Sequence, residues 1–213
     1  MLRFKLAGIP IEVRSDFLII TGLLALSRMG DPVLLVEWIV VVFFSVLLHE
    51  LGHTLAFKVF GHSPRIELNG MGGLTFPSPG MPLTNGRSII VSLAGPFAGF
   101  AVGGVVTAIA AAFPEHFESP VARQTVADLQ WVNIGWGIVN LLPIVPLDGG
   151  HVMQSLLRTR MPRPRADRLA LQITIGVAAA AAVFALMRGL TFAALMAGYF
   201  ALTAYRAMAP RER

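Results

Sequence analysis

The most constraining feature of this sequence is a metal-binding motif inside an apolar run long enough to cross a membrane. Residues 49–53 spell HELGH, an HExxH motif, and the run around them extends from Val33 to Phe60. Residues four apart share one face of a helix, so His49 and His53 can share one metal ion. Glu50 between them is placed to take a proton from a metal-activated water. Because charge at membrane depth is costly, we interpret the motif as a hydrolytic zinc site within a membrane.

The composition is that of a polytopic membrane protein. Of the 213 residues, 55% are hydrophobic and only 14% are charged, whereas about a quarter of a soluble globular protein is charged. The excess of 17 Lys and Arg over 12 Asp and Glu suits loops that flank membrane segments and gives no support to nucleic-acid binding. The sequence has no cysteine, which excludes disulfides and thiolate metal ligands.

The apolar runs predict an all-α polytopic membrane protein with about six transmembrane helices. A spanning helix needs about 20 apolar residues. We expect one transmembrane domain over residues 1–213, with a catalytic core at about 33–158 and no added soluble module. The six predicted segments are residues 17–26, 33–60, 89–113, 129–147 (continuing past a break to 157), 169–186 and 190–208.

The distribution of positive charge predicts the orientation of these segments. If the N-terminus is cytoplasmic, fourteen Lys and Arg residues lie inside, Arg211 and Arg213 among them, and only Arg28, Arg123 and Arg188 lie outside. This split follows the positive-inside rule. We therefore expect both termini in the cytoplasm, the HExxH motif nearer the cytoplasmic leaflet, and a location in a prokaryotic inner membrane.

Two stretches of the sequence are not helical in pattern. Residues 3–14 alternate apolar and polar side chains around Ala7-Gly8, which predicts a small hairpin at the cytoplasmic surface within a β-like N-terminus, residues 1–16. Residues 61–86 are rich in Gly and Pro, with β-like pieces at Arg65–Asn69 and Leu74–Phe76. We predict a membrane-associated loop or hairpin beside the catalytic helix, since irregular backbone is tolerated there when it is buried in protein or lines a wet cavity.

A third metal ligand is expected in residues 140–150, NLLPIVPLDGG. A catalytic zinc takes three protein ligands and keeps one position open. Asp148 is the other carboxylate that falls well inside a predicted span, and Pro143, Pro146 and the following Gly pair should break the helix there. Broken membrane helices are where binding sites tend to be built. The alternative is that Asp148 is a helix cap or a turn residue.

Other polar residues have weaker interpretations. Asn140 either donates a hydrogen bond to the substrate or the developing oxyanion, or makes a hydrogen bond between helices. We interpret His151 as a supporting or structural residue rather than a ligand, and His62 and His116 as solvated loop residues. Gly95, Gly99 and Gly103 form a small-residue row that predicts close helix packing.

Three motifs together resemble the site-2 protease family of intramembrane zinc metalloproteases. They are HELGH at 49–53, AGP at 94–96 and NLLPIVPLDGG at 140–150, and the family pattern is HExxH followed by NxxPxxPxDG about ninety residues later. The resemblance covers the second to fourth predicted segments. It implies a three-helix catalytic core that hydrolyses a peptide bond within or near the transmembrane segment of a membrane-protein substrate.

The resemblance also implies roles for single residues. By position, His49, His53 and Asp148 look like the ligands of one zinc ion per chain, Glu50 like the general base and acid, and Asn140 like the residue that steadies the substrate or the oxyanion. The chain resembles a minimal core member, without a PDZ or CBS domain. It departs from the family where an Asn often follows three residues after the Gly-Pro: that place is Gly99.

The expected partners are the lipid bilayer and a single-span membrane protein as substrate, with no nucleic acid. One alternative is a membrane zinc-binding protein or transporter without proteolytic activity, but residues 169–208 contain no second His/Asp cluster for ion release. Another is a homologue that captures helices without cutting them, against which the intact Glu50 argues. The identity of the substrate and the oligomeric state stay open at this point.

Overall fold

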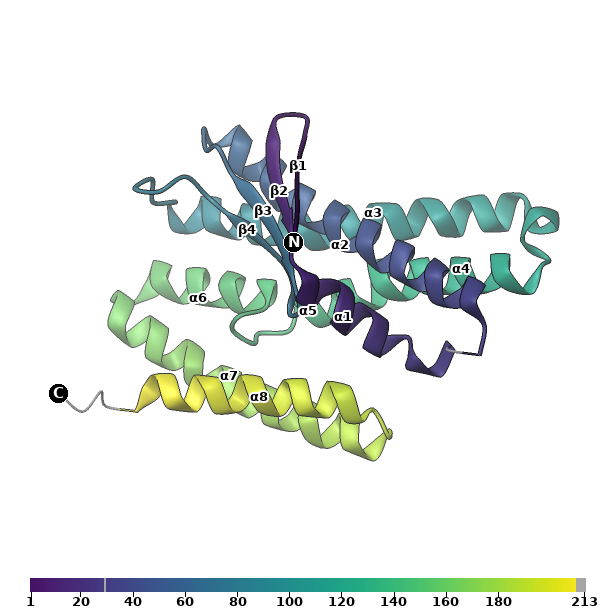
Figure 1. Cartoon of the computed structure of the whole chain (residues 1–213). Coiled ribbons are helices and arrows are strands. Elements are labelled where there is room, and N and C mark those ends of the chain that lie inside the picture. Colours follow the sequence, from purple (N-terminus) through teal and green to yellow (C-terminus); the bar gives the residue numbers. More distant parts are fainter. Residues whose placement is uncertain (29, 210–213) are drawn as a thin grey trace. The chain divides into compact units, whose positions relative to one another are not determined.

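The computed structural model describes residues 1–28 and 30–209 as helices with one small β-sheet (Figure 1). Arg211 and Arg213, used in the charge prediction, lie outside the described residues. The strands are β1 (Leu2–Leu6), β2 (Ile9–Val13), β3 (Arg65–Asn69) and β4 (Gly72–Phe76). The helices are α1 (Ser15–Leu24), α2 (Pro32–Val59), α3 (Asn85–Ala112), α4 (Pro120–Gln130), α5 (Trp136–Asn140), α6 (Asp148–Arg160), α7 (Arg163–Met187) and α8 (Thr191–Met208).

Three of these helices, α2, α3 and α7, are long and apolar enough to cross a membrane. Helix α1 is apolar but shorter. The chain is therefore an integral membrane protein that is mostly helical, while the predicted number of six spans is not confirmed. Five predicted segments coincide closely with the helices α1, α2, α3, α7 and α8.

The fourth predicted segment has different bounds from those expected. Helix α4 begins at Pro120, continues into a π-helical turn at Trp131–Gly135 and then α5, and the helical part ends at Asn140. The early start has a local cause, because the Ser119 hydroxyl accepts a hydrogen bond from Ala122 N at 3.1 Å and Pro120 occupies the first helical position. A reading based on apolar runs misses such a polar, capped helix.

The described chain divides into two compact units. Unit 1 comprises Met1–Pro82 and Ala94–Ile138, and unit 2 comprises Leu83–Leu93 and the residues from Val139 onward. Unit 1 contains the sheet, α2 and most of α3. In unit 2, α7 and α8 pack along each other through small side chains, among them the buried Ala178 and Ala194.

The sheet in unit 1 joins two hairpins in the order β1-β2-β3-β4. Ala7 and Gly8 both have positive φ (48° and 78°), as a tight two-residue turn of this kind requires. Both predicted hairpins are confirmed. Their union through parallel pairing of β2 with β3, with Ile11 opposite Ile66, was not predicted. Parallel strands need a long crossover, and here α1 and α2 provide it.

One face of this sheet forms the core of unit 1. Ile11, Ile66 and Leu68 are almost fully buried and belong to one cluster with Val42 and Leu47 of α2. Strands β3 and β4 contact α2 directly. Burial of these apolar side chains therefore fixes the sheet against the helix that carries the HExxH motif.

A buried ion cluster ties together three further elements of unit 1. Arg28 donates to Asp128 Oδ1 at 2.7 Å, makes a second hydrogen bond to Asp128 Oδ2, and donates to Glu37 Oε2 at 3.2 Å. Its guanidinium also lies over the Trp38 ring, 4.6 Å from the centroid. Hydrogen bonding to the Asp128 carboxylate raises the pKa of Arg28. The cluster links the turn after α1 with α2 and α4.

Substitution Arg28→Ala should lower the free energy of unfolding by about 3 kcal/mol, because it leaves buried carboxyl groups without their cation. Thermal or denaturant unfolding in detergent measures the loss. Arg3→Ala is the matched control: Arg3 pairs with Glu12 at 3.1 Å, but its side chain is 71% exposed, so its loss should cost under about 1 kcal/mol. Equal losses for the two variants would contradict a role for the buried cluster.

The effect of Arg28 should also depend on pH. Burial alone would raise the pKa of Asp128, but hydrogen bonds from Arg28 and Gln124 outweigh it and hold this pKa below its ordinary value. A lowered folded-state pKa stabilises the fold above the unfolded value of about 3.9 and ceases to do so as the carboxylate is protonated. The stability difference between wild type and Arg28→Ala should therefore shrink as the pH falls below about 4.

Candidate metal centre

The site begins with α2, whose start and length are locally encoded. Asp31 caps the helix by accepting a hydrogen bond from Val33 N at 2.9 Å, with Pro32 in the first turn. The helix then continues through the motif without interruption, which places His49 and His53 on one face. Their Nε2 atoms lie 3.1 Å apart, and the two ring planes are inclined by 77°. Two imidazole ligands of one tetrahedral zinc, each at about 2.1 Å, would lie about 3.4 Å apart, close to this spacing.

Helix α3 approaches the imidazole pair with bare backbone. A Cβ atom on Gly95 would lie 2.3 Å from His53 Nε2 and 2.7 Å from His49 Nε2. A Cβ on Gly52 of α2 would lie 2.5 Å from the carbonyl oxygen of Ala94. No side chain fits at either glycine, so the AGP and HELGH motifs need small residues for the same steric reason.

The predicted small-residue row on α3 packs against the π-helical turn further along. A Cβ on Gly99 would lie 3.0 Å from the backbone oxygen of Asn133, and a Cβ on Gly103 would lie 2.4 Å from Ile134 Cγ1. The prediction of close helix packing is confirmed. Gly99 departs from the family pattern, and here it allows the backbone of Asn133 to approach α3 closely.

Two supporting contacts could not be predicted from the sequence. Asn133, which is buried in the π-helical turn, donates from Nδ2 to Ser45 Oγ at 2.8 Å. Ser45 lies one helical turn before His49 on α2. The other contact is from Thr75 of β4, which donates to Glu50 Oε2 at 2.7 Å.

Glu50 itself is only 4% exposed. Strand β4 lies against it: a Cβ on Gly73 would come within 2.3 Å of Glu50 Cγ and 2.5 Å of Oε1. The predicted loop beside the catalytic helix is thus a strand that contacts the glutamate of the motif. The arrangement holds a carboxylate one residue from the first imidazole, where it can exchange a proton with a nearby water.

Asp148 lies in unit 2, in the first turn of α6. The expected break precedes it, between Asn140 and Asp148, and contains the cis peptide bond Val145-Pro146. Val145 N donates to Thr174 Oγ1 of α7 at 3.0 Å, which anchors the irregular segment. A Cβ on Gly149 would lie 2.1 Å from the carbonyl oxygen of Leu141. The Gly after Asp148 is therefore required for the start of α6 to fold back on this segment.

Within residues 1–28 and 30–209, the candidate metal ligands are His49 and His53 of unit 1 and Asp148 of unit 2. Two imidazole nitrogens and one carboxylate oxygen are the donor set of a catalytic zinc, with a fourth position left for water or substrate. The donor set fits one Zn²⁺ ion. The supporting or structural role of His151 stays a prediction.

The remaining predicted residues have mixed outcomes. Asn140 ends α5 and is partly exposed, and its contact with substrate stays a prediction. His116 is exposed beside Glu115, as expected. The prediction for His62 is wrong, because this residue is only 6% exposed. After Gly61, with φ of 85°, the chain turns back so that the His62 ring packs on Phe57 with centroids 5.3 Å apart.

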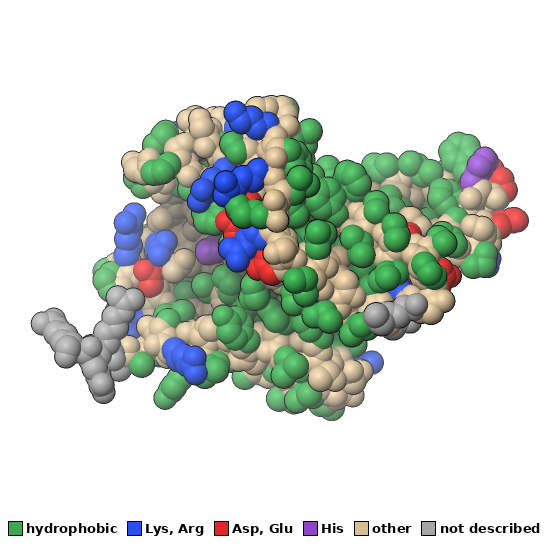
Figure 2. All heavy atoms as spheres, in the orientation of Figure 1, with side chains coloured by type: hydrophobic (Ala, Val, Ile, Leu, Met, Phe, Trp, Pro, Cys, Tyr) green, Lys and Arg blue, Asp and Glu red, His purple; other side chains and the backbone are tan. Residues whose placement is uncertain are grey.

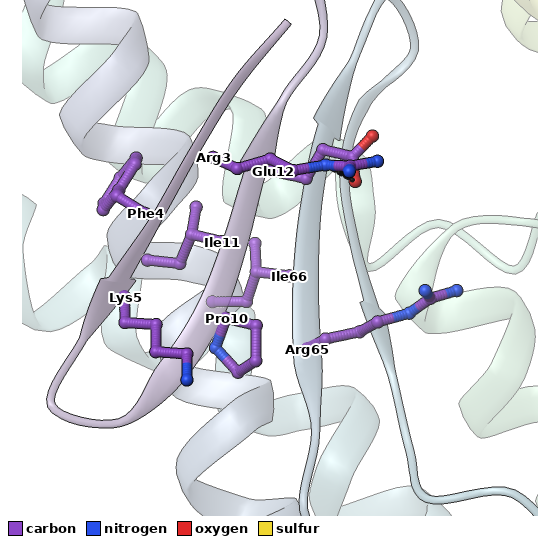
Figure 3. Close-up of a pocket in the computed structure, with 8 residues that line it drawn as sticks. All are labelled: Arg3, Phe4, Lys5, Pro10, Ile11, Glu12, Arg65 and Ile66. Atoms are coloured by element: carbon purple, nitrogen blue, oxygen red, sulfur yellow. Dashed lines mark hydrogen bonds and ion pairs between the residues drawn. The ribbon is translucent and has the colours of Figure 1, made fainter.

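A cavity of about 450 Å³ lies on strands β1 to β3 (Figure 3). Two of its lining residues, Arg3 and Glu12, form an ion pair with Nε and Oε2 3.1 Å apart. Figure 2 shows Lys and Arg side chains gathered over this sheet, with hydrophobic side chains over the helices. Neither the imidazoles nor Glu50 lines this cavity, so it is separate from the metal centre. The lining residues are Arg3, Phe4, Lys5, Pro10, Ile11, Glu12, Arg65 and Ile66.

An HExxH pair on a helix long and apolar enough to cross a membrane is typical of an integral membrane protein with a zinc site. The sequence profile of Peptidase family M50 matches residues 115–183, and a profile described as "Putative zincin peptidase" matches residues 42–147. By these matches the chain resembles peptidase family M50, the family of the site-2 proteases.

Three relatives show how far the similarity extends. The solved structure of the site-2 protease from Methanocaldococcus jannaschii superposes with a TM-score of 0.69 at 25% identity, over 100% of this chain and 97% of that chain. "Zinc metalloprotease MJ0392" of the same organism is 27% identical over 86% of this chain and 53% of its own length. "Putative zinc metalloprotease sll0528" of Synechocystis is 30% identical over 72% and 43%. The chain spans about half the length of the curated relatives it matches.

Substitution Gly95→Ala should abolish stoichiometric zinc binding, because the added methyl group would overlap both imidazole Nε2 atoms. Zinc per chain, measured by elemental analysis of purified protein, should fall at least about tenfold, as expected for a displaced ligand pair. Gly104→Ala on the same helix is the control, since a Cβ there meets nothing within 4 Å. It should retain one zinc, and a full zinc content in Gly95→Ala would refute the close approach of α3.

Proposed function

We propose that this protein is an intramembrane zinc metalloprotease, which hydrolyses a peptide bond within or near the transmembrane segment of a membrane protein. The observation that carries the proposal is the group of His49, His53 and Asp148, with the buried Glu50 between the imidazoles on an apolar helix. The names of the matched relatives, a zinc metalloprotease and a site-2 protease, support the same activity.

Each residue of the site has a distinct role in this reaction. His49, His53 and Asp148 would hold the zinc ion, which when bound supplies an activated water and a Lewis acid for the scissile carbonyl. Glu50 accepts the proton of the attacking water and then passes it to the leaving amine. Asn140 donates a hydrogen bond to the substrate backbone or to the developing oxyanion.

Substrate recognition is assigned to strand β4. A helical substrate must unwind before cleavage, because its carbonyl groups are engaged in intrahelical hydrogen bonds. Strand β4 is last in the sheet order and pairs on one side with β3. Its other edge can pair with an unwound segment by strand addition, next to Glu50. A single-span membrane protein is the substrate class that this arrangement suits.

The topology that we propose has six spans with both termini in the cytoplasm of a prokaryotic cell. Helices α2, α3 and α7 supply three spans. Helix α1, the predicted segment 129–147 and α8 would supply the others, with α1 and α8 completed by flanking residues. The bias of Lys and Arg towards the loops assigned to the inside supports this orientation.

The alternative of a zinc transporter gains no support from the chain. A transporter needs further ligands along its path so that the ion can be released. Across the described part of the chain, the candidate metal groups amount to the single one at His49, His53 and Asp148.

Substitution Glu50→Gln should retain one zinc per chain and abolish cleavage of a single-span substrate in detergent. Loss of the proton-transferring carboxylate should lower kcat by about 1,000-fold, within the range for general acid–base catalysis. Glu12→Gln, on strand β2 and outside the metal centre, is the control and should cleave at the wild-type rate. Full activity of Glu50→Gln would contradict the role of Glu50 in proton transfer and, with it, the proposed mechanism.

A further inference from the structure

The Glu50 carboxylate is held from the side of strand β4 by two residues of different kind. Thr75 Oγ1 lies 2.7 Å from Glu50 Oε2 and 3.2 Å from the Glu50 carbonyl oxygen. Gly73 leaves the space that the carboxylate fills, because a Cβ there would lie 2.5 Å from Oε1. Glu50 Oε1 thus faces the backbone of Gly73, and Oε2 accepts a hydrogen bond from the Thr75 hydroxyl.

The strand geometry explains why these two residues act together. Side chains two apart on a strand project from the same face, and in the β3–β4 pair Gly73 lies opposite Leu68 and Thr75 opposite Ile66. Leu68 and Ile66 are both buried in the core of unit 1. Gly73 and Thr75 are therefore presented to α2, and Leu74 between them is exposed on the other face.

A second hydroxyl lies behind the first. Thr54 is completely buried and lies one turn after Glu50 on α2, and its Oγ1 is 3.5 Å from Thr75 Oγ1. A hydroxyl has one proton to donate and two lone pairs to accept with. Thr75 can therefore donate to the carboxylate while it accepts from Thr54. Hydrogen bonds to a charged acceptor are the strongest, so the Thr75 hydroxyl donates its hydrogen bond to the Glu50 carboxylate.

We propose that Thr75 is a positioning residue for Glu50: its hydroxyl fixes the orientation of the carboxylate that transfers the proton. The inference rests on the proposed proteolytic function. It follows that β4 has two roles, since the strand assigned to pair with the substrate also holds the general base. A substrate segment bound at the edge of β4 is thereby aligned with Glu50 through one residue.

The variant Thr75→Val tests this role, because valine keeps the shape and removes the hydroxyl. We expect kcat to fall about 100-fold, the typical effect of a misplaced catalytic group, with zinc content and KM unchanged. Thr75→Ser should recover most of the rate, because it restores the donor. Thr107→Val on α3, where the hydroxyl donates to the Gly103 carbonyl oxygen at 2.8 Å, is the matched control and should cleave normally. A wild-type kcat in Thr75→Val, or a serine variant as slow as the valine variant, would overturn the proposal.

A second readout does not depend on proteolysis. Infrared spectra of the metal-free protein contain the carboxylate stretching bands, and the difference between wild type and Glu50→Gln identifies those of Glu50. We expect these bands to shift in Thr75→Val and to return in Thr75→Ser. Unshifted bands in Thr75→Val refute the hydrogen bond whatever the activity. Shifted bands in a protein that cleaves no membrane substrate would support the contact and refute the proposed function instead.

Discussion

The structure depends on the close approach of bare backbone to one turn of α2. Ionisable groups at membrane depth are costly unless protein surrounds them. Around this turn the surrounding protein is backbone at glycine positions, which packs directly against the side chains of the motif. Gly95 of α3 brings backbone against the two imidazoles, and Gly73 of β4 brings backbone against Glu50. A methyl group at either place would overlap a functional atom. Steric fit therefore requires glycine at these two positions, independently of the charges in the site.

Much of this arrangement could be predicted because its signals are local. An i, i+4 histidine pair on a continuous helix has the same geometry in any surroundings, so HExxH predicted the close pair of imidazoles with Glu50 beside it. Alternation around Ala7-Gly8 and the turn-rich stretch before β4 defined both hairpins. The proline and glycine residues around Asp148 defined the break that precedes α6. Apolar length located α2, α3 and α7, although α7 begins at Arg163, ahead of the predicted start at residue 169.

The parts that could not be predicted arise from pairing over long distances in the sequence. The parallel register of β2 with β3 depends on how α2 packs on the sheet, which no local pattern encodes. The burial of His62 depends on a turn that folds its ring onto Phe57. Contacts such as Thr75 with Glu50, and Asn133 with Ser45, join residues whose types are ordinary for a strand and a helix. They acquire a role only when the fold brings them to the motif.

The proposed mechanism requires that Asp148 binds the same zinc ion as His49 and His53. The sequence has no cysteine, so Asp148→Cys introduces the one sulfur that can bind zinc as a thiolate. X-ray absorption at the zinc edge should then detect a sulfur ligand at about 2.3 Å in the variant, with nitrogen and oxygen ligands alone in the wild type. A zinc-loaded variant whose metal still has only nitrogen and oxygen ligands would contradict the account.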